Sequence, residues 1–90
     1  MLRDRQSPGH AFAIAALGEA FRQAVGSGSH VRILSPIALD RESEPEPDLS
    51  IVPGAIRDYR DDHPSQPTLL VEVADEDAMV FLGASFIPMP

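Results

Sequence analysis

The sequence predicts a small α/β (α+β) domain, with one N-terminal helix packed on a small mixed or antiparallel sheet of three to four strands. Apolar residues recur at helical spacing over residues 8–25, and short apolar or alternating segments occupy residues 31–39, 48–52 and 68–73. Proline, glycine or polar residues separate these segments. With ninety residues, 43% of them apolar, the chain is expected to form a single globular domain, 1–90.

The first predicted element is a helix over residues 8–25. Ser7 is expected to cap it, and Pro8 to occupy its first turn, where a missing N–H is not needed. Gly26 and Gly28 are expected to end it. The expected buried face consists of Ile14, Leu17, Phe21 and Val25, supported by Ala13, Ala20 and Ala24.

Three strands are predicted after the helix. Residues 31–39 alternate in polarity, and Pro36 interrupts them, which predicts an edge strand or a strand with a bend. Residues 48–52 form a short strand that Pro53 and Gly54 close. Residues 68–73 are apolar on both faces, which is typical of a central strand covered on both sides.

Two carboxylates, Asp48 and Glu72, fall on the second and third of these strands. An ionised carboxylate among apolar side chains is costly unless it is paired, protonated or bound to a metal, and two close carboxylates repel unless a cation lies between them. Hard oxygen ligands suit Mg²⁺ or Mn²⁺. The residues alone leave simpler alternatives open: Asp48 as a turn aspartate that accepts backbone N–H bonds, and Glu72 as a glutamate that reaches solvent.

Other polar residues have simpler interpretations. His10 is expected on the surface at the helix N-terminus, with a substrate or supporting contact as its alternative, and Glu19 is expected in solvent, with a metal contact as its alternative. Glu46 is expected to face solvent and His63 to be structural. Between the strands predicted at 48–52 and 68–73, three acids are expected to lie in a solvated loop: Asp58, Asp61 and Asp62.

Composition restricts the possible partners and compartment. All seven basic residues are arginine, against fourteen acids, and the net charge of −7 repels nucleic-acid phosphates. The absence of cysteine excludes disulfides and thiolate zinc sites, and makes a reducing cytoplasm the expected location. No apolar run approaches the roughly 18–20 residues that span a bilayer, so no membrane partner is expected.

The segments SEPEPDLSIV (43–52) and TLLVEVAD (68–75), in this order and at this separation, resemble the Uma family of restriction endonucleases. This family is a bacterial branch of the PD-(D/E)XK nuclease superfamily. The resemblance covers residues 7–77. It implies a restriction-endonuclease-like core that cleaves DNA with Mg²⁺ or Mn²⁺. It also implies that Asp48 is the motif aspartate and Glu72 the metal-binding glutamate, both of them catalytic.

The chain departs from the family pattern in its second half. The basic residue of the motif would fall at Ala74, and family members otherwise supply a lysine from the following helix, but this chain has no lysine. Residues 78–90 carry no charge and diverge from the family. The resemblance therefore implies the N-terminal half of a nuclease domain, truncated or frameshifted and weak or inactive, whose implied DNA partner is disfavoured by the net charge.

Two alternatives to a nuclease stay open. One is a non-catalytic or vestigial interaction module that self-associates, as a homo-oligomer, through the apolar segment 78–90. The same segment has a second interpretation, as a strand or helix that covers the exposed sheet. The other alternative is a small acidic binding protein with no affinity for divalent metals.

Overall fold

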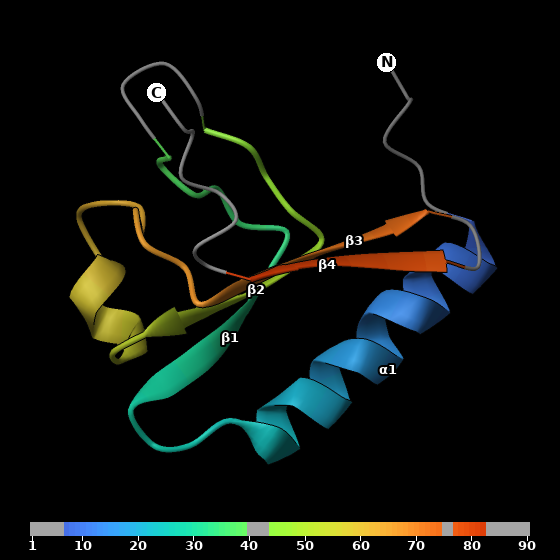
Figure 1. Ribbon diagram of the computed structural model, residues 1–90, viewed down its shortest axis with the longest axis horizontal. Helices are drawn as coiled ribbons and strands as arrows, with labels where there is room; N and C mark the ends of the chain where they lie inside the picture. The colour runs from blue at the N-terminus through green and yellow to red at the C-terminus, as the bar shows by residue number, and fades with distance from the viewer. Residues whose placement is uncertain (1–6, 40–43, 75–76, 83–90) are drawn as a thin grey trace.

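The computed structural model describes residues 7–39, 44–74 and 77–82. Within these residues one α-helix packs on a four-stranded antiparallel sheet with the strand order β1-β2-β3-β4 (Figure 1). The elements are α1 (Pro8–Ala24), β1 (Ser29–Ile33), β2 (Leu49–Pro53), the 3₁₀ helix η2 (Ile56–Tyr59), β3 (Leu69–Ala74) and β4 (Asp77–Leu82). The α+β fold class predicted from the sequence is confirmed.

Helix α1 begins as its sequence predicts. The Ser7 hydroxyl accepts a hydrogen bond from the backbone N–H of His10 at 3.0 Å, and Pro8 occupies the first turn. The helix ends at Ala24, with Val25 as an extended C-cap, one residue before the predicted end. Over the described part of the chain, no helix has the length and apolarity that a bilayer crossing requires.

Gly18 brings the helix close to the sheet. It is buried, although the apolar pattern of the helix does not include it. A Cβ atom at this position would lie 3.3 Å from Ile33 Cδ1 and 3.6 Å from Leu49 Cδ2. The missing side chain therefore lets β1 and β2 approach the helix axis, which a larger residue would prevent.

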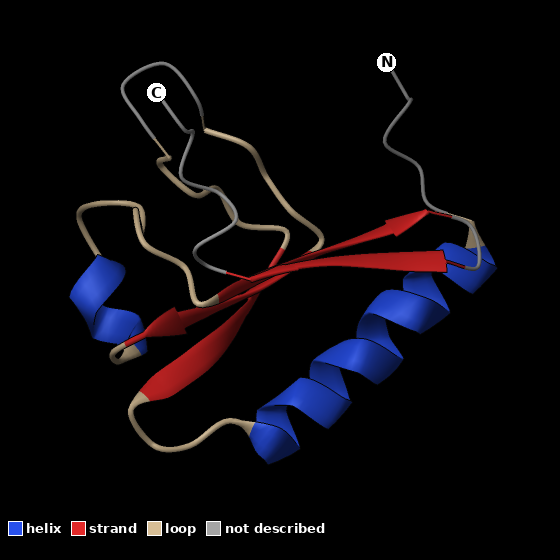
Figure 2. Cartoon of the chain, viewed as in Figure 1, coloured by secondary structure: helices blue, strands red, loops and turns tan. Residues whose placement is uncertain are grey.

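The sheet separates two apolar cores. On the helix side, Ile14 packs with Leu49, Val71 and Val73. On the other side, where the long connections lie in Figures 1 and 2, a second cluster consists of Ile37, Val52 and Leu70. Strand β3 contributes to both clusters, so the predicted central strand covered on both faces is confirmed.

Strand β1 is shorter than the predicted segment 31–39, although its edge position is as predicted. Leu34 has a φ of 50°, in the left-handed region that non-glycine residues rarely adopt, and the strand ends just before it. The chain then leaves the sheet plane, and Ile37 becomes fully buried in the second core. The alternating pattern of this segment therefore reflects two different environments instead of one strand.

Two further elements differ from the sequence prediction. The connection over residues 55–67, predicted as a loop, contains η2, where Asp58 Oδ2 accepts the Ala55 N–H at 2.9 Å. Residues 78–82 have no clear period in the sequence but belong to β4, which pairs with β3, so this part of the apolar segment forms the strand that was left open as an alternative. The rest of the apolar segment, residues 83–90, lies outside the described residues.

Substitution of Gly18 tests the close approach of helix and sheet. We expect Gly18→Leu to lower the free energy of unfolding by about 1–3 kcal/mol, because the added side chain overpacks the contact with Ile33 and Leu49. Gly9→Leu is the matched control, since nothing lies within 4 Å of a Cβ at Gly9 on the same helix. Urea unfolding measures both variants, and equal stability of the two would contradict this packing.

Candidate functional site

Asp48 lies at the entrance of β2 and is held from both sides. Its Oδ2 accepts a hydrogen bond from the Val73 N–H on β3 at 2.6 Å, and its carbonyl accepts one from the Leu34 N–H at 3.0 Å. The bond from Val73 has a charged acceptor, and hydrogen bonds of this kind contribute about 1.5–3 kcal/mol to the free energy of unfolding. The carboxylate thus accepts a backbone N–H, as its simpler interpretation expects, but from the neighbouring strand and not from its own turn.

The register of β2 and β3 brings Glu72 to Asp48. Leu49 pairs with Val71, and extending the antiparallel register by one position places Asp48 opposite Glu72. The Glu72 side chain is exposed at the surface, although its sequence neighbours on β3 are buried. The structure therefore brings the two predicted ligands together, at the edge of the core.

The electrostatics of Glu72 reflect this neighbour. Partial burial of its carboxyl raises the pKa of Glu72 above the ordinary value of 4.5, and the negative charge of Asp48 raises it further. The backbone N–H of Asp48 lowers it in part. A carboxyl group whose charged form is disfavoured by a second carboxylate is a group that a cation would stabilise.

His10 is the third polar group of this site, so it takes the supporting position that the sequence left open as its alternative and not the surface position that was expected. Its Nε2 atom lies 3.5 Å from Asp48 Oδ2, and this nitrogen is buried with no hydrogen-bond partner within the described chain. The N-terminus of α1 places it there, because Ser7 fixes the first turn. Nothing local in the sequence could place His10 beside a residue 38 positions away, since that contact depends on helix–sheet packing.

The remaining candidates lie apart from this site. Glu19 is exposed and accepts a hydrogen bond from Gln23 Nε2 at 3.1 Å. Glu46 and His63 are exposed, as the sequence predicted for Glu46. The connection between β2 and β3 carries three exposed acids: Asp58, Asp61 and Asp62. Of these, Asp58 caps the start of η2.

The donor set of Asp48 and Glu72 fits a hard divalent cation. Carboxylate oxygens are the ligands that Mg²⁺ prefers, and Mg²⁺ commonly binds through one or two carboxylates and keeps several waters. Over residues 7–39, 44–74 and 77–82, no group of three or more histidine or acidic side chains is arranged to hold a metal. The protein would therefore supply two ligands, which corresponds to a weak site.

A second polar cluster, not predicted from the sequence, lies on β1 and η2. His30 Nδ1 donates to the Gly54 carbonyl at 2.7 Å, and the Tyr59 hydroxyl donates to the Pro53 carbonyl at 2.6 Å. The Arg32 guanidinium lies 5.8 Å from the centroid of the Tyr59 ring. These contacts attach η2 to the end of β2, so we interpret the cluster as structural.

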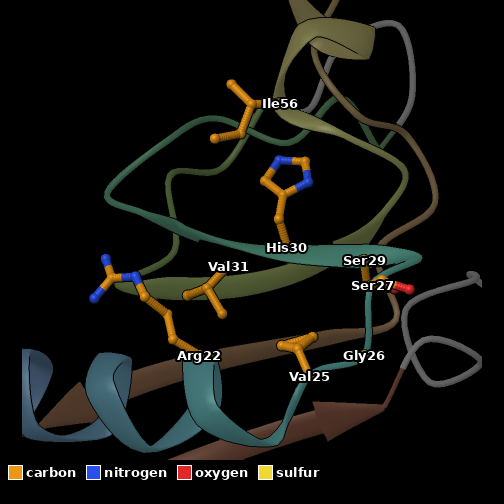
Figure 3. A pocket seen from close by; sticks show the side chains of 8 residues that line it. All are labelled: Arg22, Val25, Gly26, Ser27, Ser29, His30, Val31 and Ile56. Atoms are coloured by element: carbon orange, nitrogen blue, oxygen red, sulfur yellow. The ribbon is translucent and has the colours of Figure 1, made fainter.

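A hollow of about 550 Å³ surrounds the outer edge of β1 (Figure 3). His30 and Ile56 lie on one side of the strand, whereas Val31 and Arg22 lie on the other. The polar groups of the hollow do not point toward one another, and neither Asp48 nor Glu72 lines it. The carboxylate pair is thus the better candidate site.

No family model, curated protein or solved structure matches this chain. The resemblance to the Uma family consequently stays a hypothesis, based on the segments around Asp48 and Glu72.

The raised pKa of Glu72 predicts a pH dependence of stability. The folded state binds the Glu72 proton more tightly than the unfolded state, so the free energy of unfolding falls as pH rises from 4.5 through the folded pKa. We expect Glu72→Gln to remove this fall and to be slightly more stable than the wild type at pH 7, with solvent screening keeping the gain small. Thermal unfolding between pH 3.5 and 8 measures this difference.

Glu46→Gln is the control for this prediction, because Glu46 is exposed and lies two residues from Asp48. It should follow the wild-type pH profile throughout. A Glu72→Gln protein that is less stable than the wild type at pH 7, without added metal, would show that the two carboxyl groups do not repel each other.

Proposed function

We propose that Asp48 and Glu72 bind a Mg²⁺ or Mn²⁺ ion in a DNA endonuclease domain of the PD-(D/E)XK type, with weak or no activity in this chain. The observation that carries the proposal is that Asp48, just before β2, lies close enough to Glu72 on β3 for its charge to add to the effect of burial in raising the pKa of Glu72. The resemblance of the same two segments to the Uma family is the reason for proposing a nuclease in particular.

The two ligands would have different tasks. The hydrogen bond from Val73 to Oδ2 fixes the orientation of the Asp48 carboxylate and leaves its second oxygen for a cation. Glu72 is exposed and would complete the pair from the solvent side, where a phosphate can approach. A bound Mg²⁺ lowers the pKa of a coordinated water and stabilises the negative charge that develops on the phosphate.

The expected activity is low for two electrostatic reasons. The ninety residues contain no lysine, and removal of one stabilising group at a developing charge commonly costs about 10²–10³ in rate. His10 lies beside the pair, with its Nε2 atom 3.5 Å from Asp48 Oδ2, and would be the residue to take over part of the role of the missing lysine. The net charge of −7 also weakens the binding of DNA.

Metal binding is the first test of this proposal. We expect calorimetric titration with Mn²⁺ to give one saturable site with a dissociation constant of roughly 0.1–1 mM, the range of loosely built sites. Glu72→Gln should abolish the binding, whereas Glu46→Gln should leave it unchanged. Equally weak Mn²⁺ binding by the wild type and both variants would indicate a diffuse attraction of the ion to the acidic surface, and would refute the site.

Plasmid nicking tests the chemistry separately from metal binding. With Mn²⁺ we expect at most slow nicking, lost in Asp48→Asn, a variant that retains an oxygen acceptor for the Val73 N–H. Rapid nicking that Asp48→Asn abolishes would show that the chain does not need a lysine. Nicking that both proteins perform equally would exclude Asp48 from the reaction.

A further inference from the structure

We propose that two copies of this chain pair through β4, antiparallel and about a twofold axis at Val80, so that their sheets join edge to edge. This inference is independent of the metal site. It follows from the position of β4 in the sheet, from its exposed apolar side chains and from the self-complementarity of its sequence.

Within the described residues, strand β4 lies at an edge of the sheet and exposes two apolar side chains. It is the last strand of the sheet, and within the described chain it pairs only with β3. Met79 is 53% exposed and Val80 is 52% exposed, and these neighbours lie on opposite faces because side chains alternate along a strand. Residues 78–82 carry no charge. Natural edge strands commonly carry charges or bends that prevent pairing with another chain, and this strand has neither in those residues.

The opposite edge of the sheet has such protection. Strand β1 carries His30 and Arg32, and Leu34 turns the chain out of the strand directly after Ile33. A partner that paired with β1 would meet the positive side chain of Arg32 on this strand. Edge-to-edge association is therefore expected at β4.

A second copy of this chain is the partner that fits β4. In an antiparallel pair centred on Val80, this residue faces its own copy, Met79 faces Phe81, and Ala78 faces Leu82. All five paired positions are then apolar, and Asp77 lies beyond them, so no charge faces a like charge. Pairing of β4 with the β1 strand of another copy would instead repeat without closing, and would produce open chains of molecules.

The net charge makes the salt dependence informative. Two copies that each carry −7 repel one another at long range, and salt screens this repulsion. The paired segments themselves contain no ion pair that salt could weaken. Dimerisation is therefore expected to strengthen as the salt concentration rises.

Sedimentation velocity over a concentration series tests the proposal. The wild type should show a monomer–dimer equilibrium that salt shifts toward the dimer. Val80→Lys should raise the dimer dissociation constant at least tenfold, because it places two like charges opposite each other at the axis. Phe12→Lys is the matched control: Phe12 is 73% exposed on α1, and this variant should dimerise like the wild type.

Hydrogen exchange of the wild type decides the outcome even if Val80→Lys does not fold. The amides of residues 78–82 should gain protection as the concentration rises, and those of β1 should not. A wild type that is monomeric at its highest soluble concentration would overturn the proposal. So would a dimer that Phe12→Lys dissociates but Val80→Lys does not, or assembly into species larger than a dimer.

Discussion

The hydrogen bond from the Val73 N–H to Asp48 Oδ2 is the contact on which the candidate site depends. It joins the entrance of β2 to the far half of β3, across strands that lie 25 residues apart in the sequence. One position further along β2, Leu49 pairs with Val71, and both side chains are almost fully buried in the helix-side core. The register that places Asp48 opposite Glu72 is thus the same register that assembles the core. A one-residue slip would exchange the two faces of β3, so the packing of the core fixes which residue of β3 lies opposite Asp48.

Local patterns in the sequence were sufficient to predict the elements that depend on local physics. The helix has a cap, a first-turn proline and apolar residues at helical spacing, and it forms within one residue of the expected range. Strands β2 and β3 are short apolar segments, each with a proline two residues before it, and they form within one residue of the predicted ranges. The pair of Asp48 and Glu72 could be predicted as neighbours, because they fall on adjacent strands.

The features that the sequence did not predict depend on contacts between distant parts of the chain. Gly18 is buried because a sheet approaches it, and an isolated helical pattern contains no sign of that approach. Leu34 adopts a left-handed φ that its residue type does not favour, and Ile37 consequently enters the second core. His10 meets Asp48 only because α1 packs on the sheet, whereas the sequence offered a supporting contact for this histidine only as an alternative. The exposure of Glu72 corresponds to the simpler of its two interpretations.

The proposed metal site and the proposed dimer contact lie in the same half of the sheet. Glu72 and Met79 pair directly across β3 and β4, so the proposed site and the proposed dimer edge lie on adjacent strands. They depend on different forces, since the first requires charge and the second requires apolar contact. Loss of one is therefore compatible with retention of the other, and a chain with little or no nuclease activity can still dimerise.

Paramagnetic broadening of the backbone amide signals by Mn²⁺ would show where the ion lies and not only that it binds. At low Mn²⁺ we expect the amides of Asp48, Glu72 and Val73 to broaden first, and those of the acidic connection around Asp61 and Asp62 to stay sharp. Earlier broadening at Asp61 and Asp62, or equal broadening over all acidic segments, would contradict a metal site at the β2–β3 pair.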